Sequence, residues 1–108
     1  MITFEDFKKL EIKIGTVISA EKVPEADKLL KIIFDIGEGE HKQIIAGIAE
    51  SYPDPTQLAG KQMPILTNLE PRKLRGYESQ GMMLAVDDNG KPVLMHPEKQ
   101  TTPGSIIL

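Results

Sequence analysis

Apolar and polar residues alternate along much of the chain, and this period of two restricts it to a fold built from β-strands. Residues 11–23 show the pattern most clearly and predict one long half-buried strand. Its apolar face is predicted to carry Ile12, Ile14, Thr16, Ile18 and Ala20. Gly15 lies inside this segment and predicts a bulge or a sharp bend there.

Four further segments read as strands, at residues 30–36, 42–48, 63–69 and 81–87. Pro64 indicates that the segment 63–69 lies at a strand edge or strand end. Asn89-Gly90 predicts a type I′ hairpin turn that leads into a short strand at 93–95. Near the N-terminus, residues 4–10 predict one or two turns of helix with Thr3 as the N-cap.

Five main strands indicate an all-β fold with short helices. We expect a small closed barrel, because closure removes exposed strand edges. A β-sandwich is the competing architecture, but it usually needs about seven strands. The length of 108 residues fits one domain.

No pattern of catalytic or metal-binding residues stands out. Cysteine is absent, which excludes disulfides, thiolate metal sites and cysteine nucleophiles. Ser79 lies between glycines spaced one residue too far apart for a nucleophile elbow. His41 and His96 are isolated in the sequence. We therefore expect a protein that is not an enzyme and that needs no cofactor and no metal.

No apolar run reaches the roughly 18 residues that a membrane helix needs. The N-terminus is acidic and lacks the basic start and apolar stretch of a signal peptide. Together with the absence of cysteine, these features lead us to expect a cytoplasmic protein without a membrane partner.

Positive charge gathers in one segment, although the formal net charge is −3. Residues 70–80, which we expect to form a loop, contain Arg72, Lys73 and Arg75. Arginine and lysine bind phosphates, and Asn68, Ser79 and Gln80 could add hydrogen bonds. In an OB-fold barrel, the loop after the fourth strand overhangs the face that binds oligonucleotides. A solvated loop without a ligand is the alternative.

Stacking of successive bases is not expected, because Tyr77 is the one aromatic residue near this loop. Recognition of the shape and phosphates of a folded RNA fits the composition better.

An ordered set of short motifs resembles a known family. The motifs are Asp6-Phe7, Ile14-Gly15, Ala26-Asp27-Lys28-Leu29, the segment 43–48, Gly60-Lys61 and the segment 68–82. Together they resemble the tRNA-binding domain of the endothelial monocyte-activating polypeptide II type. This domain occurs in many methionyl-tRNA synthetases, in free-standing tRNA-binding proteins and in the CsaA export chaperone.

The resemblance implies a single domain over residues 1–108, with a five-stranded OB-fold core at about 8–88. It also implies a C-terminal extension at about 89–108 that forms a homodimer. The predicted interface residues are Val93, Met95, Ile106 and Leu108. Alternatively, Ile106 and Leu108 cover the barrel of a monomer.

The resemblance further implies a tRNA site, in which Gly76 and Gly81 shape the loop and Met82 anchors it. The predicted site residues are Lys28, Lys42, Asn68, Arg72, Lys73, Arg75, Ser79, Gln80 and Met82. Lys28 is either a solvated lysine or part of the rim. Lys42 stands where many relatives carry arginine, which keeps the charge but loses the two-pronged guanidinium contact.

These observations predict a non-catalytic module that recognises tRNA by shape and backbone. It would be the C-terminal or beta component of a methionyl-tRNA synthetase, with the catalytic chain as a partner, or a free-standing tRNA-binding protein. One alternative is a CsaA-like export chaperone that binds extended peptides. Another is an adaptor that docks a synthetase or a different factor.

Overall fold

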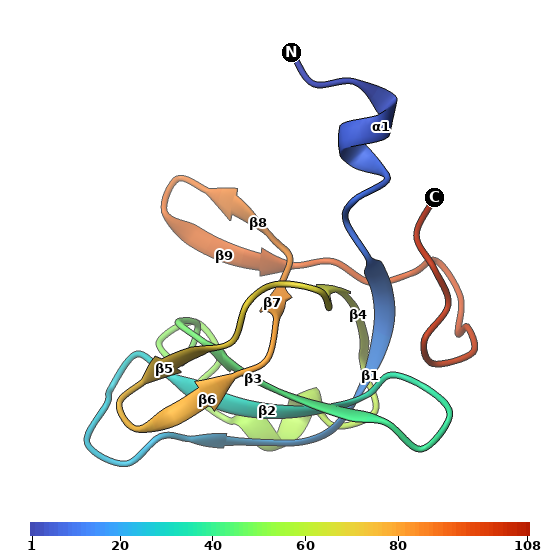
Figure 1. Ribbon diagram of the computed structural model, residues 1–108. Helices are drawn as coiled ribbons and strands as arrows, with labels where there is room; N and C mark the ends of the chain where they lie inside the picture. The colour runs from blue at the N-terminus through green and yellow to red at the C-terminus, as the bar shows by residue number, and fades with distance from the viewer.

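Short strands and turns dominate the computed structural model, which describes residues 1–108. Nine strands, one short α-helix and one 3-10 helix follow one another along the chain (Figure 1). In order they are α1 (Phe4–Phe7), β1 (Ile12–Lys22), β2 (Leu30–Asp35), β3 (His41–Ala46), η1 (Pro55–Leu58), β4 (Gln62–Leu66), β5 (Arg72–Leu74), β6 (Tyr77–Ser79), β7 (Met82–Met83), β8 (Ala85–Asp88) and β9 (Lys91–Leu94).

The main sheet has five strands in the order β3-β2-β1-β4-β7, and all of its neighbours are antiparallel. β1 is long enough to serve both halves of this sheet. Its first part pairs with β4 through residues 12–16, and its second part pairs with β2 through residues 16–22. The sheet therefore curls into a nearly closed barrel, which confirms the all-β prediction and is consistent with an OB-like barrel.

The predicted faces of β1 are wrong in part, because a bulge lies between Val17 and Ser19. Val17 is buried in the core, whereas the neighbouring Ile18 is 45% exposed. A bulge adds one residue to one strand, so side chains beyond it change faces. Gly15 itself pairs regularly with Met63. A side chain there would stand 2.3 Å from Cδ1 of Ile65, so this glycine permits a close approach rather than a bulge.

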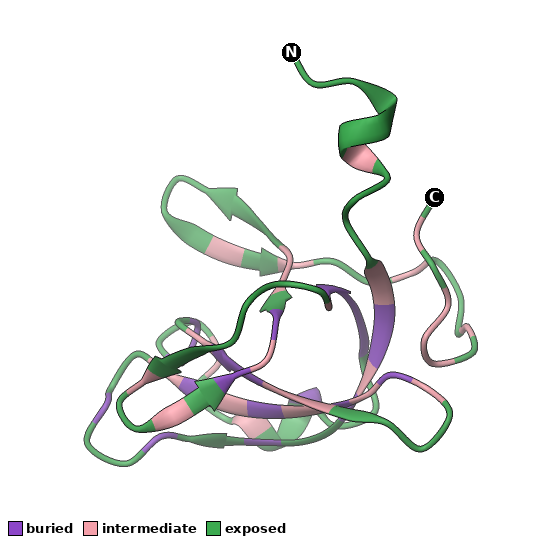
Figure 2. Ribbon diagram, viewed as in Figure 1, coloured by how far each residue is buried: buried purple, intermediate pink, exposed green.

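The core of the barrel consists of aliphatic side chains and one phenylalanine. Figure 2 marks the buried residues in purple along the strands of the barrel. Its largest fully buried members are Phe34, Leu30, Ile32, Ile44, Leu58, Met63 and Ile65. Pro64 lies among them in the middle of β4, so the prediction of a strand edge or end is wrong. Proline is tolerated there because it has no N–H to donate, and the N–H would point to the side of β4 just beyond the end of β7. On that side the Pro64 carbonyl accepts a hydrogen bond from the backbone N–H of Leu84.

The predicted strand at 81–87 is two strands in the structure. β7 belongs to the barrel, whereas β8 leaves it and pairs with β9. The turn between β8 and β9 has positive φ at both Asn89 and Gly90, which confirms the type I′ turn. All four residues of β8 are exposed, and this hairpin projects from the barrel (Figures 1 and 2).

The C-terminal segment, residues 101–108, returns to the barrel and lies beside the first half of β1. The backbone of Ile14 donates to Ser105 and accepts from Gly104, and Ile107 donates to Ile12. Further back, the side chain of the buried Gln62 exchanges two hydrogen bonds with the backbone of Thr101. The last residues thus act as an additional strand against β1.

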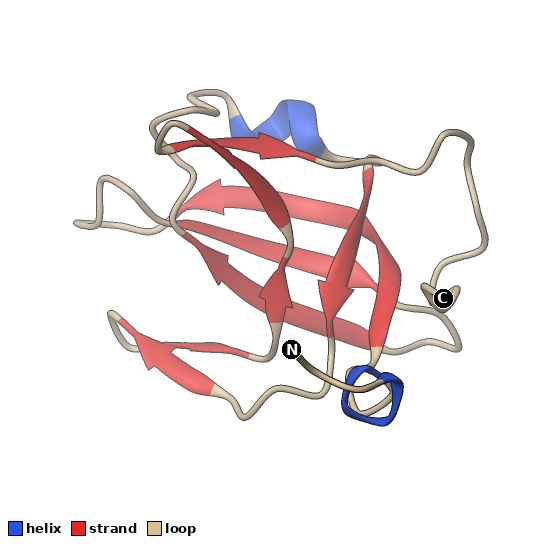
Figure 3. Cartoon of the chain, turned by 90° about the horizontal axis from the view of Figure 1, so that it is seen from above, coloured by secondary structure: helices blue, strands red, loops and turns tan.

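Helix α1 lies outside the strands, near the beginning of β1 (Figure 3). Thr3 and Asp6 form a capping box at its start, which confirms the predicted N-cap. None of its residues is buried. No helix of the structure is long and apolar enough to cross a lipid bilayer.

Candidate nucleic-acid interface

The basic segment forms a small hairpin rather than the predicted loop. β5 and β6 pair antiparallel, with Leu74 opposite Tyr77 and Arg72 opposite Ser79. Arg75 and Gly76 make the two-residue turn, with φ values of 52° and 84°. A turn of this kind needs positive φ at both residues, which glycine adopts without strain. We call residues 72–79 the basic hairpin.

Ser79 fastens the base of the basic hairpin to the edge of β3. Its side chain is buried, its hydroxyl oxygen accepts a hydrogen bond from the backbone N–H of Ile45 at 3.0 Å, and the same hydroxyl donates to the Gly81 carbonyl at 3.2 Å. The Ser79 hydroxyl therefore satisfies a backbone group that the open edge of β3 would leave without a partner.

Gln80 makes the second attachment. Its side-chain oxygen accepts from the backbone N–H of Gln43 at 2.8 Å, and its backbone N–H donates to the Gln43 carbonyl at 2.7 Å. The Gln43 side chain in turn donates to the Glu78 carbonyl at 2.9 Å. Ser79 and Gln80, which the sequence suggested as RNA ligands, thus have partners within the protein.

Near its tip, the basic hairpin contacts β2 through Tyr77. The Lys31 ammonium lies 5.6 Å from the centre of the Tyr77 ring and 2.8 Å from a carboxylate oxygen of Glu21. Glu21 and Lys31 are directly opposite each other on β1 and β2. The hydrogen bond and the negative charge of Glu21 raise the pKa of Lys31 above its ordinary value.

Arg72, Lys73 and Arg75 are exposed on the basic hairpin, and none of them forms an ion pair. Lys73 lies opposite Glu78 on the outer face, and Arg75 occupies the turn. Three cationic side chains are therefore displayed on a short hairpin that is attached to the barrel at its base and near its tip. This arrangement suits a polyanion such as a phosphate backbone.

The other predicted site residues are spread more widely. Lys28 is exposed in the β1–β2 connection, between the strand ends that carry Glu21 and Lys31. Lys42 shares the face of β3 that carries the core residue Ile44, and so lies on the opposite face from Gln43.

Asn68 and Met82 lie at the two ends of the segment that contains the basic hairpin. The Asn68 side chain bridges backbone groups, accepting from Glu11 at 2.9 Å and donating to Lys9 at 2.7 Å. Met82 pairs with Leu66 and is 44% exposed. Gly81 before it allows a close approach, because a side chain there would stand 2.6 Å from the Leu66 carbonyl oxygen.

Sequence reasoning missed Gln43, Tyr77 and Lys31 as parts of this site. The signal for the hairpin was the two-residue spacing between 72–74 and 77–79. Nothing in the sequence indicated that Lys31 would meet Tyr77, because their contact depends on how the hairpin lies on the barrel.

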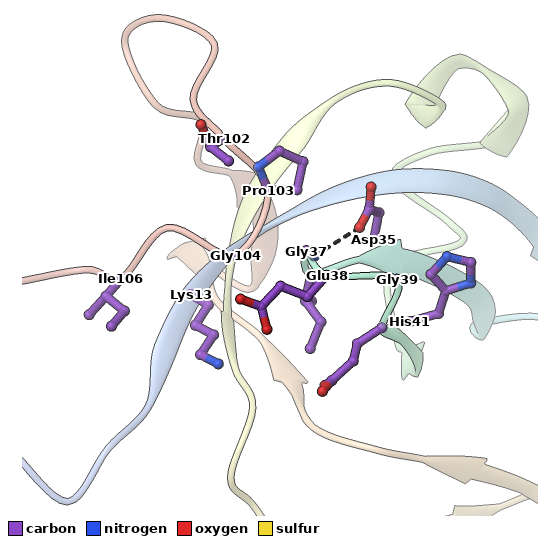
Figure 4. A pocket seen from close by; sticks show the side chains of 12 residues that line it. Lys13, Asp35, Gly37, Glu38, Gly39, His41, Thr102, Pro103, Gly104 and Ile106 are labelled. Carbon is purple, nitrogen blue, oxygen red and sulfur yellow. Dashed lines mark hydrogen bonds between the residues drawn. The ribbon is translucent and has the colours of Figure 1, made fainter.

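A pocket elsewhere on the barrel contains more acidic than basic side chains. This pocket of about 630 Å³ separates the β2–β3 turn from the C-terminal segment (Figure 4). It carries the carboxylates of Asp35, Glu38 and Glu40 against the cationic Lys13 and a histidine. The Asp35 carboxylate accepts a hydrogen bond from the backbone N–H of Gly37 at 2.8 Å (Figure 4). An acidic pocket repels phosphate, so it does not compete with the basic hairpin as a nucleic-acid site.

Comparison with known proteins decides the family. Residues 12–106 match the family model described as "Putative tRNA binding domain". The chain belongs to the tRNA-binding domain family. The match covers the barrel, the basic hairpin and the C-terminal segment of this tRNA-binding domain.

Relatives of this tRNA-binding domain occur in larger and in similar-sized proteins. It is 54% identical over 108 residues to a methionine–tRNA ligase of Methanococcoides burtonii, covering 99% of this chain and 16% of the ligase. A solved structure of a protein related to methionyl-tRNA synthetase from Pyrococcus horikoshii is 35% identical, with a TM-score of 0.93 over 100% of this chain and 98% of the other. The chaperone CsaA of Bacillus anthracis is 34% identical, with a TM-score of 0.89 over 100% and 99% of the two chains.

Proposed function

We propose that this chain is a non-catalytic module that binds tRNA through its shape and phosphate backbone. One observation carries the proposal: Arg72, Lys73 and Arg75 are exposed and free of ion pairs on a hairpin that the barrel holds in place. Membership of the tRNA-binding domain family and the similarity to methionine–tRNA ligases support it.

In this proposal, the barrel provides a rigid support and the basic hairpin provides the charge. Tyr77 is the one aromatic residue of the basic hairpin, and its ring is already in contact with Lys31. Serial stacking of bases is therefore not part of the mechanism. Linked to a synthetase, such a module would raise the local concentration of tRNA at the catalytic chain without altering the chemistry.

We further propose that the module is a homodimer formed through its C-terminal extension, at about residues 89–108. Val93, Met95, Ile106 and Leu108 are all exposed, by 44%, 37%, 69% and 104%. An apolar pocket of about 420 Å³ lies beside them and is lined by Ile14, Leu84, Met95 and Ile107, among others. Exposed apolar surface next to an apolar hollow is typical of a protein interface.

A CsaA-like chaperone is the second candidate function, and the same pocket is the observation that favours it. A hollow lined by aliphatic side chains, prolines and one histidine fits the apolar side chains of an extended peptide. Binding of this kind would depend little on salt, because it uses no charge on the basic hairpin.

A salt titration of binding to total tRNA tests the proposal, with unstructured RNA and duplex DNA as competitors. We expect Lys73→Ala with Arg75→Ala to weaken binding of all tRNAs alike and to flatten the log–log salt slope by up to about two. Lys91→Ala with Lys99→Ala is the matched control, since both lysines are exposed and lie outside the basic hairpin. Absence of binding at low salt, or equal losses in the two double variants, would reject the proposal.

A further inference from the structure

Lys31 is held between two groups on the side of the barrel that faces the basic hairpin. Its ammonium lies 2.8 Å from the Glu21 carboxylate and 5.6 Å from the centre of the Tyr77 ring, and its side chain is 27% exposed. It lies on the outer face of β2, since its neighbours Leu30 and Ile32 fill the core. This lysine is therefore engaged by protein groups rather than displayed to solvent like Lys73.

The Tyr77 contact reaches a part of the hairpin that no side-chain hydrogen bond holds. Ser79 and Gln80 attach the base to β3, but no side-chain hydrogen bond holds Leu74, Arg75, Gly76 or Tyr77. Tyr77 adjoins the turn that carries Arg75, and Lys31 is the cation over its ring. The tip with its guanidinium is thus oriented through a lysine on a different strand.

We propose that Lys31 is a positioning residue for tRNA binding: held by Glu21, it fixes the basic hairpin through the Tyr77 ring and makes no phosphate contact itself. The inference rests on the proposed function and adds a residue that the basic hairpin does not contain. A hairpin fixed before binding loses less conformational entropy when the phosphates arrive, and this preorganisation increases affinity.

The experiment measures tRNA affinity and its salt slope for Lys31→Met, Tyr77→Leu and the double variant. A cation–π contact of ordinary strength predicts a loss of about two- to fivefold for each single variant. The double variant should lose no more than either single one, because both substitutions remove the same contact. The salt slope should stay unchanged, whereas a lost phosphate contact would lower it by about 0.9.

Two conservative variants and one control complete the design. Lys31→Arg and Tyr77→Phe each keep the cation over the ring and should retain the affinity of the wild type. Lys22→Met removes the same charge from an exposed lysine at the end of β1 and should have little effect.

Each other outcome rejects the inference in a recognisable way. A flatter slope for Lys31→Met with an unchanged Tyr77→Leu would make Lys31 a direct phosphate ligand. If Lys31→Met lost no more tRNA affinity than Lys22→Met, Lys31 would have no role in binding. If the losses of Lys31→Met and Tyr77→Leu added up in the double variant, the two residues would not act through one shared contact. If the wild type itself bound no tRNA, the proposed function would fail together with the inference. If the wild type bound and only the Lys31 series were silent, the inference alone would fail.

Discussion

Gln80 occupies the place of a strand residue beside Gln43. Its side-chain oxygen accepts the Gln43 N–H at 2.8 Å, and its own N–H reaches the Gln43 carbonyl at 2.7 Å. Two residues further along β3, Ser79 accepts the N–H of Ile45 in the same manner. The junction between β3 and residues 79–80, which we call the seam, is therefore closed partly by side-chain hydrogen bonds. A continuous strand would use backbone groups instead.

Removal of the Ser79 hydroxyl should destabilise the protein. In Ser79→Ala, the buried N–H of Ile45 loses its acceptor, and we expect the free energy of unfolding to fall by about 1–3 kcal/mol. Urea denaturation measures this change, and hydrogen exchange at the Ile45 amide reports its location. Ser51→Ala, at an exposed serine without a side-chain hydrogen bond, should leave stability nearly unchanged. Equal stability of the two variants would show that the seam does not need the hydroxyl.

The Asn68 side chain should stabilise the chain segment that precedes β1. Its amide joins Lys9 and Glu11 to the segment after β4. Because the site is exposed, we expect Asn68→Ala to cost only about 0.5–1.5 kcal/mol of unfolding free energy. Asn68→Asp keeps the acceptor for Glu11 but loses the donor to Lys9, so it should fall between the wild type and Asn68→Ala. A loss of tRNA affinity in fully folded Asn68→Ala would instead favour the predicted RNA contact.

Gly104 should tolerate no side chain. It has a φ of +87°, and a Cβ there would stand 2.2 Å from the Ile36 carbonyl oxygen. Gly60 has a similar φ of +85° but open space around it. We expect Gly60→Ala to cost about 1–2 kcal/mol for the left-handed backbone, and Gly104→Ala to cost about 1–3 kcal/mol more for the clash. Thermal unfolding of both variants measures the difference, and equal costs would contradict the close backbone contact.

A charge at Ile106 should disrupt the proposed dimer. Ile106 is 69% exposed in the C-terminal segment, and burial of a carboxylate in an interface is unfavourable. We expect Ile106→Glu to shift sedimentation equilibrium toward monomer at micromolar concentration. Ile18→Glu, at a 45% exposed isoleucine on β1, serves as the control and should not change the mass. A monomeric wild type would remove the dimer from the proposed function.

The pKa of Lys31 should lie above the ordinary value of a lysine side chain. The hydrogen bond and charge of Glu21 raise its pKa, so we expect a side-chain NMR titration to place it above the ordinary 10.5. Glu21→Gln should lower this pKa. Because the pKa is higher in the folded state, the contact contributes stability below pH 10.5, and this contribution is lost as the pH rises through the folded-state pKa. A titration of Lys31 that does not change in Glu21→Gln would contradict the ion pair.

Alternation along the sequence predicted β2 well, because Leu30, Ile32 and Phe34 all face the core. It could not define β4, where all five residues are buried. It failed within β1, where Ile14 is buried under the C-terminal segment while Val17 and Ala20 face the core. Sequence spacing does not reveal the bulge between Val17 and Ser19. The position of Pro64 in its strand was predicted wrongly for a related reason. Whether β4 can accommodate a proline there depends on where β7 ends, and the sequence does not show that.

The site was predictable in its charges and less so in its geometry. Arg72, Lys73 and Arg75 were predicted as ligands because basic residues cluster in the sequence, and the structure leaves all three exposed. The roles of Ser79 and Gln80 were not recognisable, because a polar side chain that binds the protein looks the same in a sequence as one that binds a ligand. Three-residue strands around an Arg-Gly turn are also too short for periodicity to detect.

The side-chain seam separates what the barrel needs from what the ligand needs. Gln43, Ser79 and Gln80 close the barrel, whereas residues 72–78 are attached only through them and through Tyr77. The length, charge and tip of the basic hairpin can therefore change without rebuilding the core. If these closing residues are kept, the basic hairpin can be replaced by a hairpin for a different polyanion while the barrel stays the same.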